Sequence, residues 1–158
     1  MKFCPAHKTI CVAVMVLTIV GLVFGLWLYL RSFRQVKDIV LVQIKDLAIK
    51  AEIALLPQDH YQGLSGRDSL CSDCGLLFVF PDKQIRSFIM RDMNFPLDII
   101  FIEEGVIKNI SASASQNDST TIYFSQGAAD QVLEINAGLS ASYGLAPGDQ
   151  VNIKNYEN

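Results

Sequence analysis

The sequence predicts a mostly β domain, barrel-like or sandwich-like, that carries two short helices and follows one N-terminal transmembrane helix. Three observations support this fold class. An uninterrupted apolar run fills residues 10–30, many short apolar segments between turn signals fill residues 39–158, and only two later segments have a helical pattern. We therefore divide the chain into a tail (1–9), a membrane helix (10–30), a stalk (31–38) and one domain (39–158).

The apolar run contains no charged residue between Lys8 and Arg31. About twenty helical residues, rising about 1.5 Å each, cross a hydrocarbon core of about 30 Å. The run exceeds the h-region of a cleaved signal peptide and ends without a small-residue cleavage site. We expect a retained, single-pass signal anchor that contacts membrane lipid through residues 10–30. The Lys and Arg residues on the two sides of the run nearly balance, so they do not decide the orientation. The very short leading tail is typical of a signal anchor and favours an extracytoplasmic domain.

A GxxxG pattern lies inside the run, formed by Gly21 and Gly25. Such a pattern allows two membrane helices to approach closely and form a homodimer. The alternative is a chance pair of glycines in a glycine-containing apolar segment.

The first elements of the domain are two strands and a short helix. Residues 39–44 and 47–55 are apolar on both sides of a Lys-Asp break, and the second segment alternates apolar and polar residues as a half-buried strand does. Pro57 ends this strand. Residues 58–66 are polar, with two apolar side chains three positions apart, so they predict a short helix that Gly66 closes.

The central elements are four strands. Residues 76–80 form a compact apolar strand that a turn at Pro81 ends, and residues 87–90 form another short strand. Residues 97–103 are almost wholly apolar, as in a strand buried on both faces. A Glu-Glu-Gly turn joins them to the strand over residues 106–112, which predicts a hairpin.

The last elements follow a loop rich in Ser, Asn and Asp over residues 113–120. Short strands are predicted over residues 121–124 and 132–136, and a short helix over 139–143. A Pro-Gly pair, typical of a type II turn, precedes the final strand over residues 150–153.

The composition excludes several classes of function. Sixteen acidic and eleven basic residues follow the apolar run, which gives a net charge of −5 and argues against a nucleic-acid partner. No phosphate-binding loop, dinucleotide fingerprint or GxSxG motif is present. His60 is the single histidine after the run, and a lone histidine on a polar helix is usually a solvated surface residue. We expect no cofactor and no bound metal.

Cys71 and Cys74 form a CxxC pair. In an oxidising compartment they can close a small disulfide loop, and elsewhere they can be plain thiols. A redox pair would need a helix N-terminus to lower the thiol pKa, and here a strand follows. A zinc site would need further ligands from His60 or nearby aspartates. A disulfide or plain thiols is the favoured interpretation, with redox and metal sites as alternatives.

Asp98 is the one charge within the apolar segment 95–102. A buried carboxylate is costly unless it is paired, and Arg67 is a candidate partner. This pair would either fix the helix to the sheet or form the polar floor of a pocket. The structural role is favoured over the functional one.

A series of motifs in one order resembles the DUF192 family over about residues 48–153. The matching segments are residues 63–70, 75–81, 87–90, 96–102, 132–138 and 148–149. The resemblance implies a small β-rich domain, often exported or membrane-tethered, with no established biochemical role. Arg67 and Asp98 match typical family positions, whereas Ile89 stands where the family commonly has Trp.

Three functional hypotheses follow. The first is a noncatalytic, membrane-anchored envelope module that binds a ligand or partner through a pocket containing Arg67, Phe88, Met90 and Asp98. The second is a small envelope hydrolase in which Asp98 is the general acid or base and Arg67 stabilises negative charge. The third is a thiol redox or metal site at Cys71 and Cys74. The binding module is the favoured hypothesis.

Overall fold

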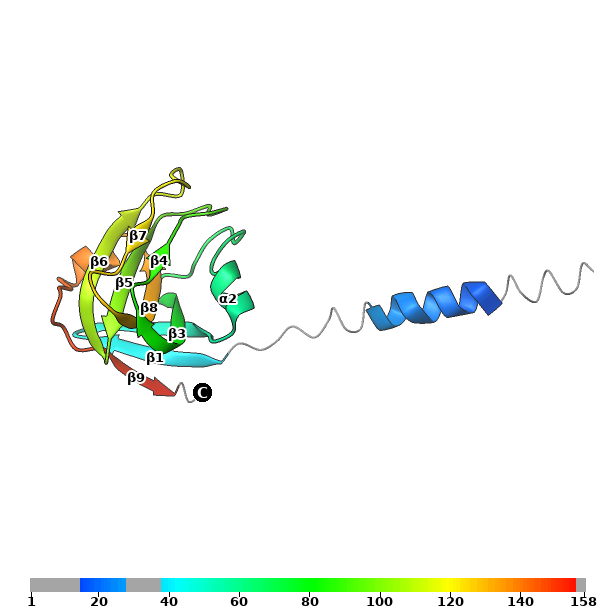
Figure 1. Cartoon of the computed structure of the whole chain (residues 1–158), viewed down its shortest axis with the longest axis horizontal. Helices are drawn as coiled ribbons and strands as arrows, with labels where there is room; N and C mark the ends of the chain where they lie inside the picture. The colour runs from blue at the N-terminus through cyan, green and yellow to red at the C-terminus, as the bar shows by residue number, and fades with distance from the viewer. Residues whose placement is uncertain (1–14, 28–37, 156–158) are drawn as a thin grey trace, which may run out of the picture. The chain divides into compact units, whose positions relative to one another are not determined.

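The structure, a computed structural model, describes residues 15–27 and 38–155. The chain divides into two compact units, Met1–Val36 and Lys37–Asn158. Figure 1 draws a helix over the described residues 15–27 of the first unit, and the second unit as a folded domain built mainly of β-strands.

All residues of the helix over residues 15–27 are exposed, Gly21 and Gly25 among them. Among the residues described, no helix combines the length and the apolar character that crossing a membrane requires. The predicted tail (1–9), the two ends of the predicted membrane helix and nearly all of the stalk (31–38) lie outside the described residues. The glycine-mediated homodimer stays a prediction.

The described part of the domain, residues 38–155, contains nine strands and two short helices. The strands are β1 (Ile39–Ile44), β2 (Leu47–Ala54), β3 (Cys74–Gln84), β4 (Ser87–Phe88), β5 (Leu97–Glu103), β6 (Val106–Ala114), β7 (Tyr123–Phe124), β8 (Ala129–Asn136) and β9 (Asn152–Asn155). The helices are α2 (Pro57–Gln62) and α3 (Leu139–Ser142). The mostly β fold class with two short helices is therefore confirmed.

Seven strands form one sheet in the order β6-β5-β8-β3-β2-β1-β9, and β4 pairs with β7 in a separate two-stranded ribbon. All neighbours in the large sheet are antiparallel except β2 and β3. A parallel pair cannot be joined by a tight turn, so the chain crosses over one face of the sheet between these strands. This crossover, residues 55–73, contains α2.

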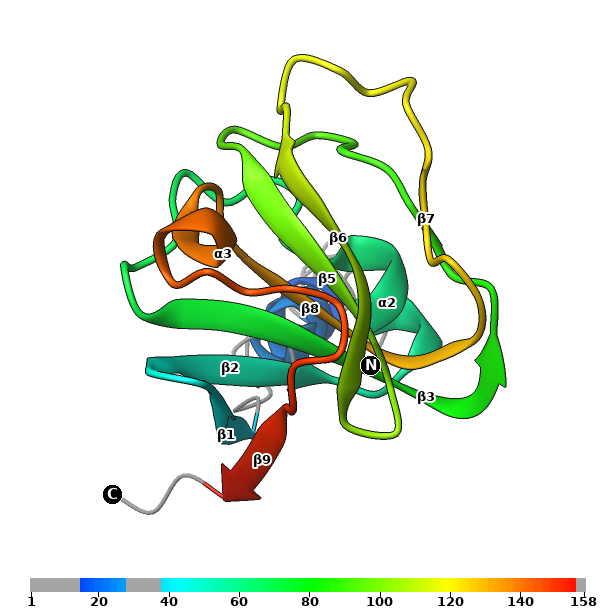
Figure 2. The same ribbon diagram turned by 90° about the vertical axis from the view of Figure 1, so that its left-hand side faces the viewer.

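Both faces of the sheet are buried. One face carries a cluster that includes Ile49, Leu77 and Ile100, against which Leu139 of α3 packs. The other carries a cluster that includes Phe78 and Phe101, together with Leu64 from the crossover. Figures 1 and 2 accordingly show α3 and α2 on opposite faces of the sheet.

This burial explains the continuous apolar sequence of β5. Alternate β5 residues enter the two clusters, Ile100 and Ile102 on one face, and Leu97, Ile99 and Phe101 on the other. Side chains alternate between faces along a strand, so a strand covered on both sides needs apolar residues at every position. The predicted doubly buried strand and its hairpin with β6 are confirmed.

The barrel-like form of the fold prediction is wrong, because the sheet stays open. Its two edge strands are β6 and β9. Residues 148–151, just before β9, bond to the start of β6: the Ile107 amide donates to the Asp149 carbonyl at 3.0 Å, and the Val151 amide donates to the Gly105 carbonyl at 2.8 Å. These bonds cover a few residues only, so the ladder does not close around the core.

The largest difference within an element concerns β3. The turn predicted at Pro81 does not end the strand, which continues to Gln84. The pairing of β3 with β8 shifts register between Val79 and Gln84. Proline has no N–H to donate, so an irregular stretch of the ladder accommodates it without ending the strand.

Gly75 permits the close approach of β2, β3 and β8. A Cβ at this position would lie 2.8 Å from Ile49 Cγ2 and 2.9 Å from the Glu134 carbonyl oxygen. We predict that Gly75→Ala lowers the free energy of unfolding by about 1–3 kcal/mol, because backbone must shift to admit the methyl group. Urea unfolding measures this loss. Asn152→Ala, at an exposed position of β9, is the control and should change stability by less than about 0.5 kcal/mol.

Candidate functional site

A cavity of about 360 Å³ opens on the α2 face of the domain. It lies among α2, β3, β4 and the segments that flank β4. Its floor is made of four buried residues, and these are Leu64, Phe78, Met90 and Glu134. Its rim consists of exposed side chains, namely Tyr61, Gln62, Ile85, Ser87 and Ile89. The cavity is therefore apolar in depth except for one carboxyl group.

Aromatic side chains form much of the wall. The His60 ring packs on Phe80, with 4.5 Å between ring centroids. Phe88 of β4 meets Phe78 of β3 edge to face at 4.9 Å. Such pairs hold the rings in defined orientations, so the wall is preorganised for an apolar ligand.

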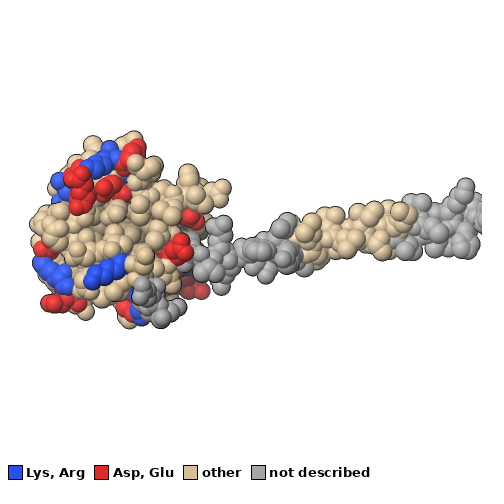
Figure 3. Space-filling view, turned by 90° about the horizontal axis from the view of Figure 1, so that it is seen from below, with Lys and Arg blue, Asp and Glu red and all other residues tan. Residues whose placement is uncertain are grey.

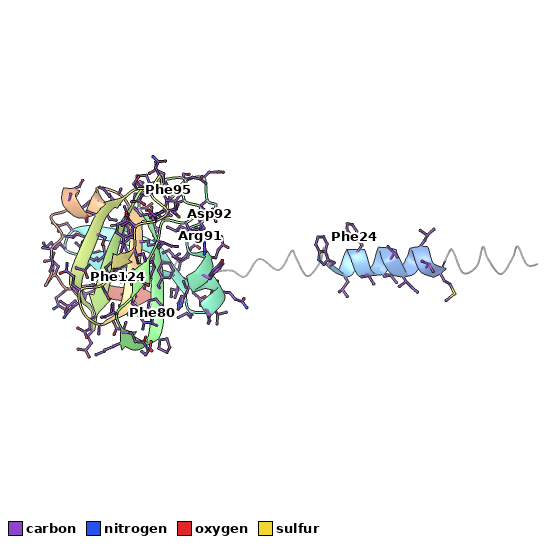
Figure 4. All side chains as sticks on the ribbon, turned by 45° about the horizontal axis from the view of Figure 1, so that its top comes forward. Phe24, Phe80, Arg91, Asp92, Phe95 and Phe124 are labelled. Atoms are coloured by element: carbon purple, nitrogen blue, oxygen red, sulfur yellow. A yellow bond between two sulfur atoms is a disulfide. The ribbon has the colours of Figure 1, made fainter. Side chains whose placement is uncertain are left out.

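Two arginines stand in the same wall. The Arg86 guanidinium lies 3.9 Å from the centre of the Phe80 ring and pairs with Asp82 at 2.5 Å. The Arg91 guanidinium lies 4.0 Å from the centre of the Tyr61 ring and donates to the Tyr61 carbonyl at 2.7 Å, which places Arg91 beside α2 (Figure 4). The stacking fixes both cations at the cavity.

Glu134 is the unusual group of the site. The residue is 6% exposed, and its Oε2 has no hydrogen-bond partner. Burial removes water from the carboxyl and raises the pKa of Glu134 to about 8, against an opposing effect of the Arg67 charge. An unpaired buried carboxyl group is expensive to ionise, so it keeps its proton at neutral pH.

Glu134 lacks a counter-ion because the nearest arginine is already paired. Glu52 on β2 and Glu134 on β8 are both in register with Leu76 on β3, so they occupy one row across the sheet. Arg67 donates to both carboxylate oxygens of Glu52, each at 2.7 Å. This two-pronged pairing fixes the plane of the guanidinium toward Glu52.

The predicted pocket residues separate into two groups. Phe88 and Met90 line the cavity, and their part in binding stays a prediction. Arg67 and Asp98 do not line it, and they do not pair with each other. The expected Arg67–Asp98 pair is therefore wrong, because the two residues serve opposite faces of the sheet.

Asp98 holds α3 to the sheet. It is fully buried, and it is in register with Ile135, a member of the cluster on the α3 face. Its Oδ1 accepts a hydrogen bond from the Ser113 amide at 2.8 Å. Its Oδ2 accepts from the Ser140 amide at 2.9 Å and from the Ser140 hydroxyl at 2.6 Å. Asp98 therefore has a structural role, but it fixes α3 and not the helix beside Arg67, and its partners are two backbone amides and one hydroxyl in place of an ion pair.

His60 is a wall residue and not the solvated surface residue that its polar helix suggested. Its Nε2 lies 3.0 Å from the Ala54 carbonyl oxygen, so this nitrogen carries the hydrogen and donates. The Ser65 hydroxyl, which also lines the cavity, donates to the Arg91 carbonyl at 2.8 Å. Both groups thus have structural partners.

Cys71 and Cys74 form a disulfide next to the start of β3. This agrees with the favoured interpretation of the CxxC pair. Asp73 lies between them, and the three side chains form the one group in the described residues with metal-ligand spacing. The bonded sulfurs are not thiolates, and Asp73 pairs with Lys50 at 2.9 Å. In this state the group lacks the deprotonated sulfur ligands that zinc prefers.

The disulfide closes a loop of minimal length, so its contribution should be modest. We predict that the double variant Cys71→Ser/Cys74→Ser loses about 2 kcal/mol of unfolding free energy, from the chain entropy of so short a loop. Urea unfolding with and without dithiothreitol measures it. The reductant should bring the parent protein to the stability of the variant and leave the variant unchanged.

Sequence reasoning missed Glu134, although a usable signal was present. Glu134 is the one charge in the apolar segment 132–136, as Asp98 is in the segment 95–102. The sequence therefore marks two buried acids and does not say which one faces a cavity.

Comparisons with known proteins agree with this fold. A family model described as DUF192, Uncharacterized ACR, matches residues 40–153. A solved protein of unknown function from Novosphingobium aromaticivorans DSM 12444 is 33% identical, with a TM-score of 0.67, over 72% of this chain and 83% of that one. A Sinorhizobium meliloti 1021 protein, described provisionally as a transcription regulator, is 30% identical, with a TM-score of 0.68, over 74% of this chain and 93% of that one. No curated protein matches the chain.

Proposed function

Because the chain belongs to the DUF192 family, whose description assigns no activity, we propose from the geometry that the domain is a noncatalytic module that binds a small ligand in the cavity beside α2. The observation that carries this proposal is the unpartnered carboxyl of Glu134 at the cavity floor. Buried polar groups are almost always satisfied, so an unsatisfied one at a cavity marks a place where a ligand supplies the partner.

The contacts of the cavity support binding over catalysis. A hydrolytic site needs a nucleophile within hydrogen-bond reach of a base. Within the described part of the chain, the Ser65 hydroxyl donates to the Arg91 carbonyl, and His60 Nε2 faces the Ala54 carbonyl. The hydrolase hypothesis through Asp98 and Arg67 lacks support, because neither residue lines the cavity.

We also propose that residues 10–30 hold the module at a membrane, on the extracytoplasmic side. The support is the length of the uncharged run in the sequence. The described helix, residues 15–27, has no charged side chain, and Figure 3 shows it without the blue and red that mark charged residues.

The test of anchoring is extraction of native membranes with alkaline carbonate. The full-length protein should stay in the pellet, and deletion of residues 1–31 should release the domain. Full-length protein in the lipid-free supernatant would contradict the anchor.

The proposal includes no nucleic-acid partner. Residues 38–155 hold eight basic and fifteen acidic side chains. Figure 3 shows both signs of charge interspersed on one face. A nucleic-acid site would need a basic patch, so the description of the Sinorhizobium relative is not carried over to this chain.

The test of the binding module is a small-molecule screen followed by ¹H–¹⁵N NMR spectra. Binding should shift the amide signals of cavity residues such as Gly63, Phe88 and Met90. Met93→Trp, which fills the cavity with a larger side chain, should remove these shifts. Ile153→Trp, on β9, is the matched control and should keep them. Shifts that survive Met93→Trp would place binding elsewhere.

A further inference from the structure

We infer that the ligand of this cavity is an apolar organic acid whose carboxylate accepts a hydrogen bond from the Glu134 carboxyl. This inference rests on the proposed binding function and names the chemical class that fits it. The argument combines the surroundings of Glu134, the fixed charges of the wall and the size of the cavity.

The carboxyl group at the cavity floor needs a hydrogen-bond acceptor. Glu134 is 6% exposed, its Oε2 is unpartnered, and its neighbours on the floor are Leu64, Phe78 and Met90. No water-like environment stabilises a negative charge there, so the group keeps its proton at neutral pH. A carboxylic acid held neutral in an apolar site acts as a donor, and a donor needs an acceptor.

The wall favours an acceptor that is negatively charged. Arg86 and Arg91 line the cavity, each stacked on an aromatic ring. No other acid lines the cavity among the described residues. Outside the lining, Asp82 pairs with Arg86 at 2.5 Å and the exposed Asp92 lies 3.8 Å from Arg91 Nε, so the positive potential that remains when Glu134 is neutral comes mainly from Arg91. This potential attracts an organic anion and opposes an ammonium group that would otherwise pair with an ionised Glu134.

The remaining surface favours an apolar body. Phe80 and Phe88 stand in the wall, and the exposed Ile85 and Ile89 continue the apolar surface to the rim. A volume of about 360 Å³ accommodates one ring with a short chain. The anionic end would reach Glu134, and the ring would lie between the aromatic side chains and the rim.

A matched set of probes tests the class: 4-phenylbutyrate, 4-phenylbutylamine and 4-phenylbutanol. They share one apolar body and differ in the end group. Affinities are measured by NMR titration of the full-length protein in mild detergent, at pH 7 and pH 9. The variants are Glu134→Gln and, as a charge-removal control outside the cavity, Glu103→Gln, whose carboxylate pairs with Lys108 at 2.9 Å.

At pH 7 the acid should bind at least tenfold more tightly than the amine. Its Kd should rise about tenfold by pH 9, when Glu134 loses the donated proton. In Glu134→Gln the side-chain amide still donates, so the acid should bind with the pH 7 affinity at both pH values. Glu103→Gln should behave as the parent protein does.

The Glu134→Gln variant is needed to assign the pH dependence of binding, because other ionisable groups surround Glu134. These are Glu52 on β2, His60 and Tyr61 on α2, Arg67 in the crossover, and Arg86 and Arg91 beside β4. All of them remain in Glu134→Gln. A pH dependence that persists in this variant would belong to them and would overturn the assigned role of Glu134.

The remaining outcomes separate this inference from the proposed function. If the amine binds most tightly and Glu134→Gln abolishes its binding, the ligand class is wrong while the binding module stands. If the alcohol and the acid bind equally, the role of the negative charge is wrong. If no probe shifts the cavity signals and the wider screen also finds no ligand, both proposals fail.

Discussion

Replacement of Asp98 by alanine is expected to lower the free energy of unfolding by about 3–5 kcal/mol, since it leaves buried donors without their acceptor. One carboxylate oxygen accepts a hydrogen bond from the Ser113 amide. The other accepts hydrogen bonds from the amide and the hydroxyl of Ser140. The Ser140 side of this arrangement joins α3 to the sheet. Without these hydrogen bonds, α3 is no longer joined to β5 through Asp98.

Chemical unfolding followed by circular dichroism measures this loss. Asp98→Asn should be intermediate, because the amide keeps one acceptor oxygen and turns an N–H₂ toward another donor. Asp130→Asn is the control, because Asp130 accepts one backbone amide, that of Glu104 at 3.1 Å, in an exposed setting. A loss below about 1 kcal/mol for Asp98→Ala would contradict the structural role assigned to this residue.

The second large effect is a pH-dependent stability that comes from Glu134. Its ordinary pKa of 4.5 applies to the unfolded chain, and burial raises the pKa of the folded state to about 8. Between these values the folded state binds one more proton than the unfolded state. Stability from this group is therefore fully present below pH 4.5, falls as pH rises and levels off above pH 8, a total change of about 3–5 kcal/mol.

The variant Glu134→Gln should remove this contribution. Its unfolding free energy relative to the parent protein should rise steadily from pH 4 to pH 9, so that the variant is the more stable protein at pH 9. Urea unfolding at three or four pH values gives the difference curve. Glu103→Gln, which removes a carboxylate paired with Lys108, should show no comparable rise. A flat difference curve for Glu134→Gln would contradict the raised pKa.

The candidate site was only partly predictable from the sequence. Phe88 and Met90, which the sequence analysis named as pocket residues, line the cavity. Arg67 and Asp98 were marked correctly as residues needing partners. Their true partners, Glu52 for Arg67 and Ser140 for Asp98, lie 15 and 42 positions away and have no local signature.

Glu134 shows the same limit of prediction from sequence. The sequence places one acid among the apolar residues of β8 and another among those of β5. Period-two alternation says which neighbours share a face with each acid, but not what covers that face. In the folded domain α3 covers Asp98, whereas the cavity beside α2 lies over Glu134.

By itself, the sequence determined the positions of most strands, the hairpin of β5 and β6, and the double burial of β5. These features depend on local spacing and on turn residues, which adjacent positions specify. Tertiary structure alone decided that the sheet stays open, that the crossover brings Arg67 to Glu52, and that Glu134 lies at the cavity floor. The physical reason is that strand order and sheet faces arise from pairings between distant segments, whose geometry no short stretch of sequence encodes.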